Sequence, residues 1–182
     1  SATPNIKAYD LAYAYEISTI IHFGMKEMVE ENKDVLYYLT LENQNYVHPH
    51  MPKNSEKGIL KGLYNVIENK KASVQLFGSG PLLTEVLEAA ELLKKDWGVE
   101  SSVWSVTSYS ELRKESEEID RWNLNHPSEA LKKSFLQKSL DGLETPIVAV
   151  TDYMKLVSEQ IRPFIKNKYY TLGTDGFGRS ET

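Results

Sequence analysis

The hydrophobic positions of this chain follow helical spacing in some segments and strand-like runs in others. Over residues 11–31, apolar side chains recur every three or four positions, which predicts an amphipathic helix with Asp10 as its N-cap. The apolar run 35–41 predicts a buried strand. A polar loop follows over residues 42–55, and this helix, strand and loop together are typical of the last unit of an α/β domain.

Residues 54–71 are polar and contain two glycines, which predicts a linker. Beyond it, strand and helix patterns alternate, which predicts an α/β fold with a mostly parallel open sheet and helices on both faces. A boundary between two domains is therefore expected within residues 54–71. The second domain has expected strands at 73–77, 102–107, 146–151 and 170–173, and expected helices at 82–95, 110–120, 128–140 and 153–165.

Composition narrows the class of protein. The 182 residues carry a net charge of -5 with acids and bases interspersed, which argues against a nucleic-acid or anionic-membrane surface. The absence of cysteine excludes disulfides, thiolate nucleophiles and cysteine zinc sites, and favours an intracellular protein. No apolar run approaches the roughly 18 residues that span a bilayer. Neither an initiator Met nor a signal pattern is present, so we expect the chain to begin inside a longer protein.

Few motifs point to chemistry. Gly78-Ser79-Gly80 after a strand is compatible with a dinucleotide loop, but Leu83 stands where the third glycine belongs, so a tight turn is favoured. His48 and His50 flank Pro49 and could ligate a metal, although no further ligand has a helpful spacing; contact with a substrate or partner is the preferred alternative. Asp152 is most simply an N-cap. These residues alone do not define a catalytic centre.

The last segment, residues 169–182, changes from an apolar run to a cluster of glycines with Asp175 and Arg179. In a parallel α/β domain, the loop after a strand is where ligands and partners bind. The helix that should follow is absent from the sequence, so we expect the C-terminal domain to be truncated here.

Several segments, taken in chain order, closely resemble one family: the C-terminal third of the homodimeric-type E1 component of the pyruvate dehydrogenase complex. The residues that carry the resemblance are Pro4 to Asp10, Tyr13 to Glu16, Asn43 to Tyr46 ahead of Met51-Pro52, Gln75-Leu76 with Gly78-Ser79-Gly80, Ser105 to Ser108, Arg121 to Asn123 with His126-Pro127, Thr151 to Leu156, and Leu172 to Ser180.

The resemblance implies a thiamine-diphosphate enzyme of the transketolase-like superfamily, acting as a cytoplasmic homodimer. Such an enzyme decarboxylates pyruvate and transfers the acetyl unit to the lipoyl group of the E2 acetyltransferase. It further implies that residues 1–55 are the tail of the pyrimidine-binding domain and residues 56–182 a transketolase-like C-terminal domain. The C-terminal domain is expected to support dimer and domain contacts.

The family's ligands for thiamine diphosphate and Mg²⁺ lie upstream of Pro4, so the chain alone is expected to be inactive and to bind neither cofactor nor metal. The residues expected nearest to the substrate are Asp10, Asn45, Tyr46 and His48. The family pattern often places a histidine directly beside Tyr46, and here the histidine is His48.

Two alternatives remain open. One is a non-catalytic α/β module that docks a partner through an exposed sheet edge. The other is a transketolase-like enzyme that acts on another 2-oxo acid or a sugar. The segment 174–179 argues against this second alternative.

Overall fold

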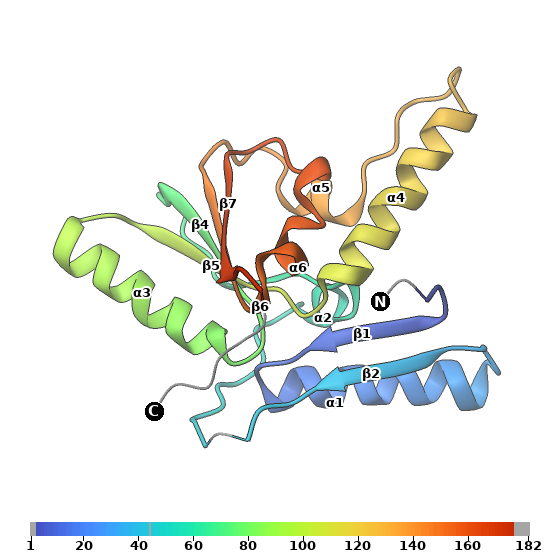
Figure 1. Ribbon diagram of the computed structural model, residues 1–182, viewed down its shortest axis with the longest axis horizontal. Coiled ribbons are helices and arrows are strands. Elements are labelled where there is room, and N and C mark those ends of the chain that lie inside the picture. The colour runs from blue at the N-terminus through green and yellow to red at the C-terminus, as the bar shows by residue number, and fades with distance from the viewer. Residues whose placement is uncertain (1–2, 44, 177–182) are drawn as a thin grey trace.

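The computed structural model describes residues 3–43 and 45–176, which form two sheets (Figure 1). The first sheet has two parallel strands, β1 and β2, and the second has five strands in the order β3-β5-β4-β6-β7. Among the strands of the described residues, only β3 runs antiparallel to its neighbour, so the predicted mostly parallel α/β fold is confirmed. The strands are β1 (Ile6–Asp10), β2 (Leu36–Thr40), β3 (Tyr64–Ile67), β4 (Val74–Gly78), β5 (Ser101–Ser105), β6 (Ile147–Met154) and β7 (Tyr169–Thr174).

Helices cover the five-stranded sheet on both sides (Figure 1). One side carries α3, and the other carries α4, α5 and α6, while α1 lies against the two-stranded sheet. The helices are α1 (Ala14–Met25), α2 (Glu56–Lys61), α3 (Leu82–Trp97), α4 (Tyr109–Asn125), α5 (Phe135–Ser139) and α6 (Lys155–Glu159), with a π-helix over Lys26–Glu30 and a 3-10 helix over Arg162–Phe164.

The first helix begins later than its apolar pattern predicts. Asp10 is not its N-cap, because β1 continues through Asp10 and the N-cap is Tyr13. The Glu16 carboxylate provides the cap by accepting hydrogen bonds from the N–H groups of Ala12, at 2.6 Å, and Tyr13, at 3.0 Å. Leu11, Ala12 and Tyr13 are nearly fully buried, so their apolar side chains mimic a helical pattern while the backbone turns from strand to helix.

The predicted linker over residues 54–71 is wrong, since it contains α2 and β3. Its few apolar residues explain why this segment is structured, because Ile59, Leu63 and Tyr64 are at most 4% exposed and pack into the core. β3 pairs with β5 at the edge of the sheet.

Three boundaries in the second half also differ from the predictions. α4 continues through Trp122 to Asn125, beyond the end of the helix expected over 110–120. The predicted helix over 128–140 forms only as α5, which begins after Ser134 because that side chain caps it. Asp152 lies inside β6 and is not an N-cap, so the helix expected over 153–165 shrinks to α6 and the 3-10 turn. The expected β4, α3 and β5 are confirmed, and Gly98 is the C-cap of α3.

A buried carboxylate joins the two sheets. Glu16, on α1, is fully buried and accepts hydrogen bonds from the hydroxyls of Tyr64 on β3 and Ser105 on β5, both at 2.7 Å. With the two backbone N–H groups at the helix start, four donors satisfy its two oxygens. Burial raises the pKa of Glu16, and these hydrogen bonds act against that rise.

Backbone contacts add to this junction. The Asp10 N–H donates to the carbonyl of Thr107 at 2.8 Å, and the Thr107 hydroxyl donates to the carbonyl of Ile59 at 2.8 Å. The Ser108 hydroxyl donates to the carbonyl of Ala8 at 2.6 Å. β1 is therefore held against the loop that follows β5.

Substitution of Gly62 tests the packing of this junction. Gly62 ends α2 with a φ of 106°, and a Cβ there would lie 2.5 Å from the carbonyl oxygen of Ser108. We expect Gly62→Ala to lower the free energy of unfolding by about 3 kcal/mol, since left-handed strain and a backbone clash add. Gly98→Ala is the control, because Gly98 has a φ of 65° and nothing within 4 Å, so only strain of about 1 kcal/mol is expected. Equal losses in urea denaturation would refute the clash.

The pH dependence of stability tests a second cluster, centred on Glu27. Burial opposes its ionisation, but hydrogen bonds from Lys7, Tyr37 and Lys33 outweigh burial and lower its pKa to about 2. A depressed folded-state pKa stabilises the protein above the unfolded pKa, and that stability disappears as the pH falls. We therefore expect Glu27→Gln to cost on the order of 3 kcal/mol at pH 7. This deficit should shrink below the ordinary glutamate pKa of about 4.3 and vanish near pH 2.

The control for this experiment is Glu30→Gln, at an exposed position of the same π-helix. Its unfolding free energy should track that of the unmodified chain at every pH. A constant deficit for Glu27→Gln from pH 7 to pH 2 would show that the cluster does not depend on the charge of Glu27.

Candidate functional site

Asp10 lies at the end of β1, facing the turn that follows β4. Its Oδ1 accepts a hydrogen bond from the Thr40 hydroxyl at 2.7 Å, and its Oδ2 is buried with no hydrogen-bond partner. Burial raises the pKa of Asp10, and the hydroxyls of Thr40 and Ser79 oppose that rise. The structure therefore places this predicted substrate-proximal residue between the two sheets.

The Gly78-Ser79-Gly80 turn is closed by this same carboxyl group. Gly80 has a φ of 51°, and a Cβ on it would lie 2.6 Å from Asp10 Oδ1. A phosphate at the start of α3 would need the space that the carboxyl group fills, and it would meet a like charge there. The tight-turn interpretation of this motif fits the structure, and a dinucleotide loop does not.

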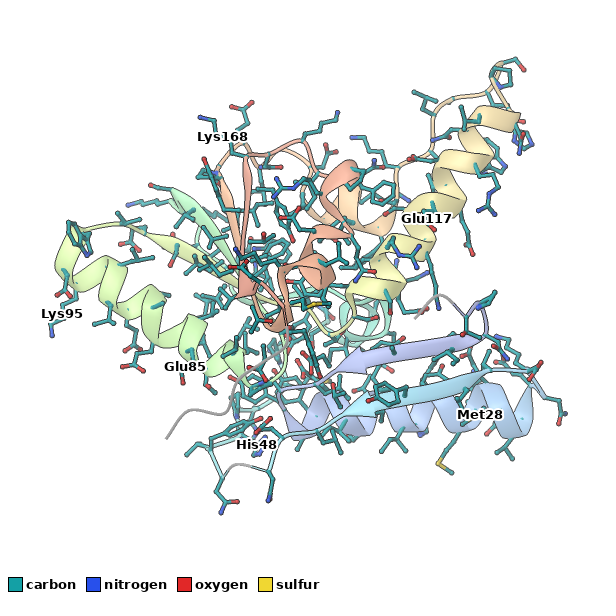
Figure 2. All side chains as sticks on the ribbon, viewed as in Figure 1. Met28, His48, Glu85, Lys95, Glu117 and Lys168 are labelled. Carbon is teal, nitrogen blue, oxygen red and sulfur yellow. The ribbon has the colours of Figure 1, made fainter. Side chains whose placement is uncertain are left out.

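Tyr46 and His48 come together at the other side of the strand-to-helix turn that follows β1. The Tyr46 hydroxyl donates to the carbonyl of Ala12, and His48 Nδ1 accepts the N–H of Ala14, the first residue of α1, at 3.1 Å. The two rings lie 4.9 Å apart, and the His48 ring also meets the edge of Tyr13. Figure 2 shows His48 near the N-terminal end of α1 and Met28 beyond the opposite end, in the π-helix that follows.

This docking fixes the tautomer of the histidine. Because Nδ1 accepts a hydrogen bond, a neutral His48 ring carries its proton on Nε2. His48 and Asn45 are exposed, whereas Tyr46 is half-buried. The loop is therefore anchored at the start of α1. From there it exposes the Nε2–H donor of His48 and the side-chain amide of Asn45.

The described residues do not assemble a metal centre. Within residues 3–43 and 45–176, no group of three or more His, Cys, Asp or Glu side chains could hold a metal ion. His50 is exposed in the same loop as His48.

None of the helices in the described part of the chain combines the length and the apolar character that a membrane span requires.

The terminal glycine-rich segment is described only through Gly176. Asp175 forms an exposed ion pair with Lys155 at 2.5 Å. Arg179 and the rest of the signature lie outside the described residues.

A cavity of about 230 Å³, which sequence patterns did not predict, lies between the two sheets. We call it the switch-point cavity, because it lies beside the end of β4, where the order of the strand connections reverses. It is lined by residues of β1 and β2 and by residues near the carboxyl ends of β4, β5 and β6: Ala8, Tyr9, Asp10, Tyr38, Thr40, Ser79, Ser108, Tyr109, Ser110, Tyr153, Val157 and Gln160. The one available signal was that Ser79 directly follows β4 and Ser108 comes three residues after β5, because strand ends of a parallel sheet share one edge.

A larger hollow of about 920 Å³ lies on the surface beside the ends of α4 and α5. Its charged lining residues are of both signs, for example Asp120 and Lys133. None of the buried unpartnered polar atoms found in the described residues belongs to this lining. The smaller cavity is therefore the better candidate for a specific ligand.

Comparisons with known proteins agree with the fold. Residues 62–182 match the family model of the transketolase-like C-terminal domain, and residues 1–49 match that of the pyruvate dehydrogenase E1 component middle domain. Among solved structures, transketolase from Campylobacter jejuni superposes with a TM-score of 0.66 at 21% identity, covering 98% of this chain and 23% of that one. At this identity, the similarity shows the fold alone.

Curated relatives are much closer in sequence. The pyruvate dehydrogenase E1 component of Pseudomonas aeruginosa is 50% identical over 100% of this chain, and that of Cupriavidus necator is 47% identical over the same share. The protein of the same name from Escherichia coli K12 is 47% identical over 98% of the chain. The chain spans 20–21% of the length of these relatives. It therefore belongs to the family of transketolase-like C-terminal domains, and its first 49 residues are similar to the pyruvate dehydrogenase E1 middle domain.

Proposed function

We propose that this chain is part of a pyruvate dehydrogenase E1 component. The observation that carries the proposal is the match to relatives of that name, at 43–50% identity over 98–100% of the chain. The whole enzyme would decarboxylate pyruvate with thiamine diphosphate and pass the acetyl unit to the lipoyl group of E2. It would work as a homodimer in the bacterial cytoplasm.

Within that enzyme, residues 1–55 would end the pyrimidine-binding domain and residues 56–182 would form the C-terminal domain. The Glu16 junction then lies between domains, because it joins α1 to β3 and β5. Its role would be to fix the angle at which the two domains meet.

The described residues do not fit thiamine diphosphate or Mg²⁺. The Asp10 carboxyl group closes the glycine turn at the start of α3, and the described ranges offer no cluster of metal ligands. The groups that hold the cofactor would therefore lie in other parts of the enzyme. Bound there, thiamine diphosphate would supply the electron sink for decarboxylation.

What this chain would contribute to the active site is the loop that carries Asn45, Tyr46 and His48. Two hydrogen bonds, to Ala12 and Ala14, fix this loop at the start of α1, and the Glu16 carboxylate holds the backbone there in place. The outward Nε2–H of His48 would then donate a hydrogen bond to the substrate or to a nearby group of the enzyme. Asp10 faces Thr40 and Gly80, so we propose no contact between Asp10 and pyruvate.

Calorimetry of the chain tests where the cofactor binds. Titration with thiamine diphosphate in the presence of Mg²⁺ should give no heat of specific binding, since neither group finds its ligands here. Binding with a micromolar Kd would contradict this assignment.

Kinetics of the whole enzyme that contains this chain test His48. Replacing His48 with Ala should lower kcat/KM for pyruvate roughly 10- to 100-fold, because a positioned donor is lost. His48→Gln should recover part of the activity, since its amide can donate from near the position of Nε2. His22→Ala, at an exposed position on α1, is the control and should leave kcat/KM unchanged.

Two outcomes would count against this proposal. If His48→Ala behaved like His22→Ala, His48 would have no part in the reaction. If the enzyme preferred another 2-oxo acid or a sugar phosphate to pyruvate, the assignment of the substrate would be wrong.

A further inference from the structure

The switch-point cavity has the position that binding sites take in open α/β sheets. From β4 the chain passes through α3 to β5 on one side, and later returns to β6 on the other side of β4. The order of connections therefore reverses at β4, and ligands bind outside the carboxyl ends of the strands at such a point. Ser79 follows β4 and Tyr153 lies near the end of β6, and both line the cavity.

Three buried polar atoms of the cavity lining make no hydrogen bond of normal geometry, although the Ser79 hydroxyl lies beside the Asp10 carboxyl group and the Tyr109 hydroxyl beside that of Tyr169. These are Asp10 Oδ2, the Ser79 hydroxyl and the Tyr109 hydroxyl, three of the four such side-chain atoms in the described residues. Ser79 is 1% exposed and Tyr109 4% exposed. Buried polar groups are nearly always hydrogen-bonded, so three polar groups with incomplete hydrogen bonding at one cavity favour a polar occupant.

The charge of the lining selects the kind of occupant. Asp10 is the single charged side chain among the described lining residues, and the other polar groups are uncharged hydroxyls and the Gln160 amide. An anion would meet the carboxylate without a compensating cation. A cation would give Oδ2 the donor that it lacks, and the Tyr38 and Tyr153 side chains in the lining can add cation–π attraction.

Size limits the occupant further. At about 230 Å³, the cavity is below the range of roughly 300–1,000 Å³ that accepts drug-sized ligands. The volume therefore suits a small molecule with one apolar group and one charged end.

We propose that the switch-point cavity binds a small organic cation carrying a primary ammonium group. Asp10 Oδ2 accepts one N–H of the ammonium group, and the hydroxyls of Ser79 and Tyr109 are the other polar contacts. The site is independent of the proposed E1 activity, because its residues differ from the Asn45–His48 loop.

The experiment is isothermal titration of the full chain with benzylamine and with benzyl alcohol. The two molecules share size and ring, and they differ in the charged group. Benzylamine should bind with a Kd of about 1 mM or below, and benzyl alcohol at least tenfold more weakly. Inorganic phosphate and glycerol, titrated in parallel, should give no binding heat.

Three variants locate the binding. Asp10→Asn should fold, since it removes an unpaired buried charge, and should lose at least tenfold in benzylamine affinity. Asp34→Asn, at an exposed position, is the matched control and should bind like the unmodified chain. Val157→Phe should also abolish binding by filling the cavity. Thermal unfolding of each variant verifies that it is folded.

The proposal fails if benzylamine does not bind at millimolar concentration, or if benzyl alcohol binds equally well. It also fails if Asp10→Asn is folded and retains the affinity. Preferential binding of phosphate or glycerol would assign the cavity to an anion or a polyol and would overturn it.

Discussion

The carboxylate of Glu16 is buried where α1, β3 and β5 meet, and the arrangement of the molecule depends on it. A buried carboxylate is costly unless its oxygens are hydrogen-bonded, and here two backbone N–H groups and the hydroxyls of Tyr64 and Ser105 supply the donors. The donors come from three elements, so they are satisfied together only when α1 stands in one orientation on the five-stranded sheet. The two matched family segments thereby share a single junction.

The features with functional interest follow from that orientation. It places Asp10 in front of Gly80, which closes the glycine turn and leaves one carboxylate oxygen unpaired in the switch-point cavity. It also sets the first turn of α1, on which Tyr46 and His48 dock. In the proposed E1 enzyme, this chain would thus position a loop and a domain, while the cofactor is held elsewhere.

Sequence patterns predicted the elements whose side chains follow one clear period, such as β4, α3 and β5, and the resemblance of particular motifs predicted the family. They failed where tertiary contacts override local pattern. Leu11, Ala12 and Tyr13 are apolar because they are buried in a turn, and the polar segment 54–71 forms α2 and β3 because three of its side chains enter the core. Asp10 was recognised as a site candidate, but its partners Thr40 and Gly80 are distant in sequence, so its place at the cavity could not be predicted.

Hydrogen exchange of the full chain with and without Glu16→Gln tests the central claim most directly. In Glu16→Gln an NH₂ group replaces one carboxylate oxygen, so this NH₂ group faces hydrogen-bond donors and those donors lose their acceptor. The account therefore predicts that protection of backbone amides falls together in α1, β3 and β5. Glu30→Gln, on the exposed side of the π-helix, should leave protection unchanged. Loss of protection confined to α1, with β3 and β5 as protected as before, would contradict the claim that one carboxylate couples the two parts.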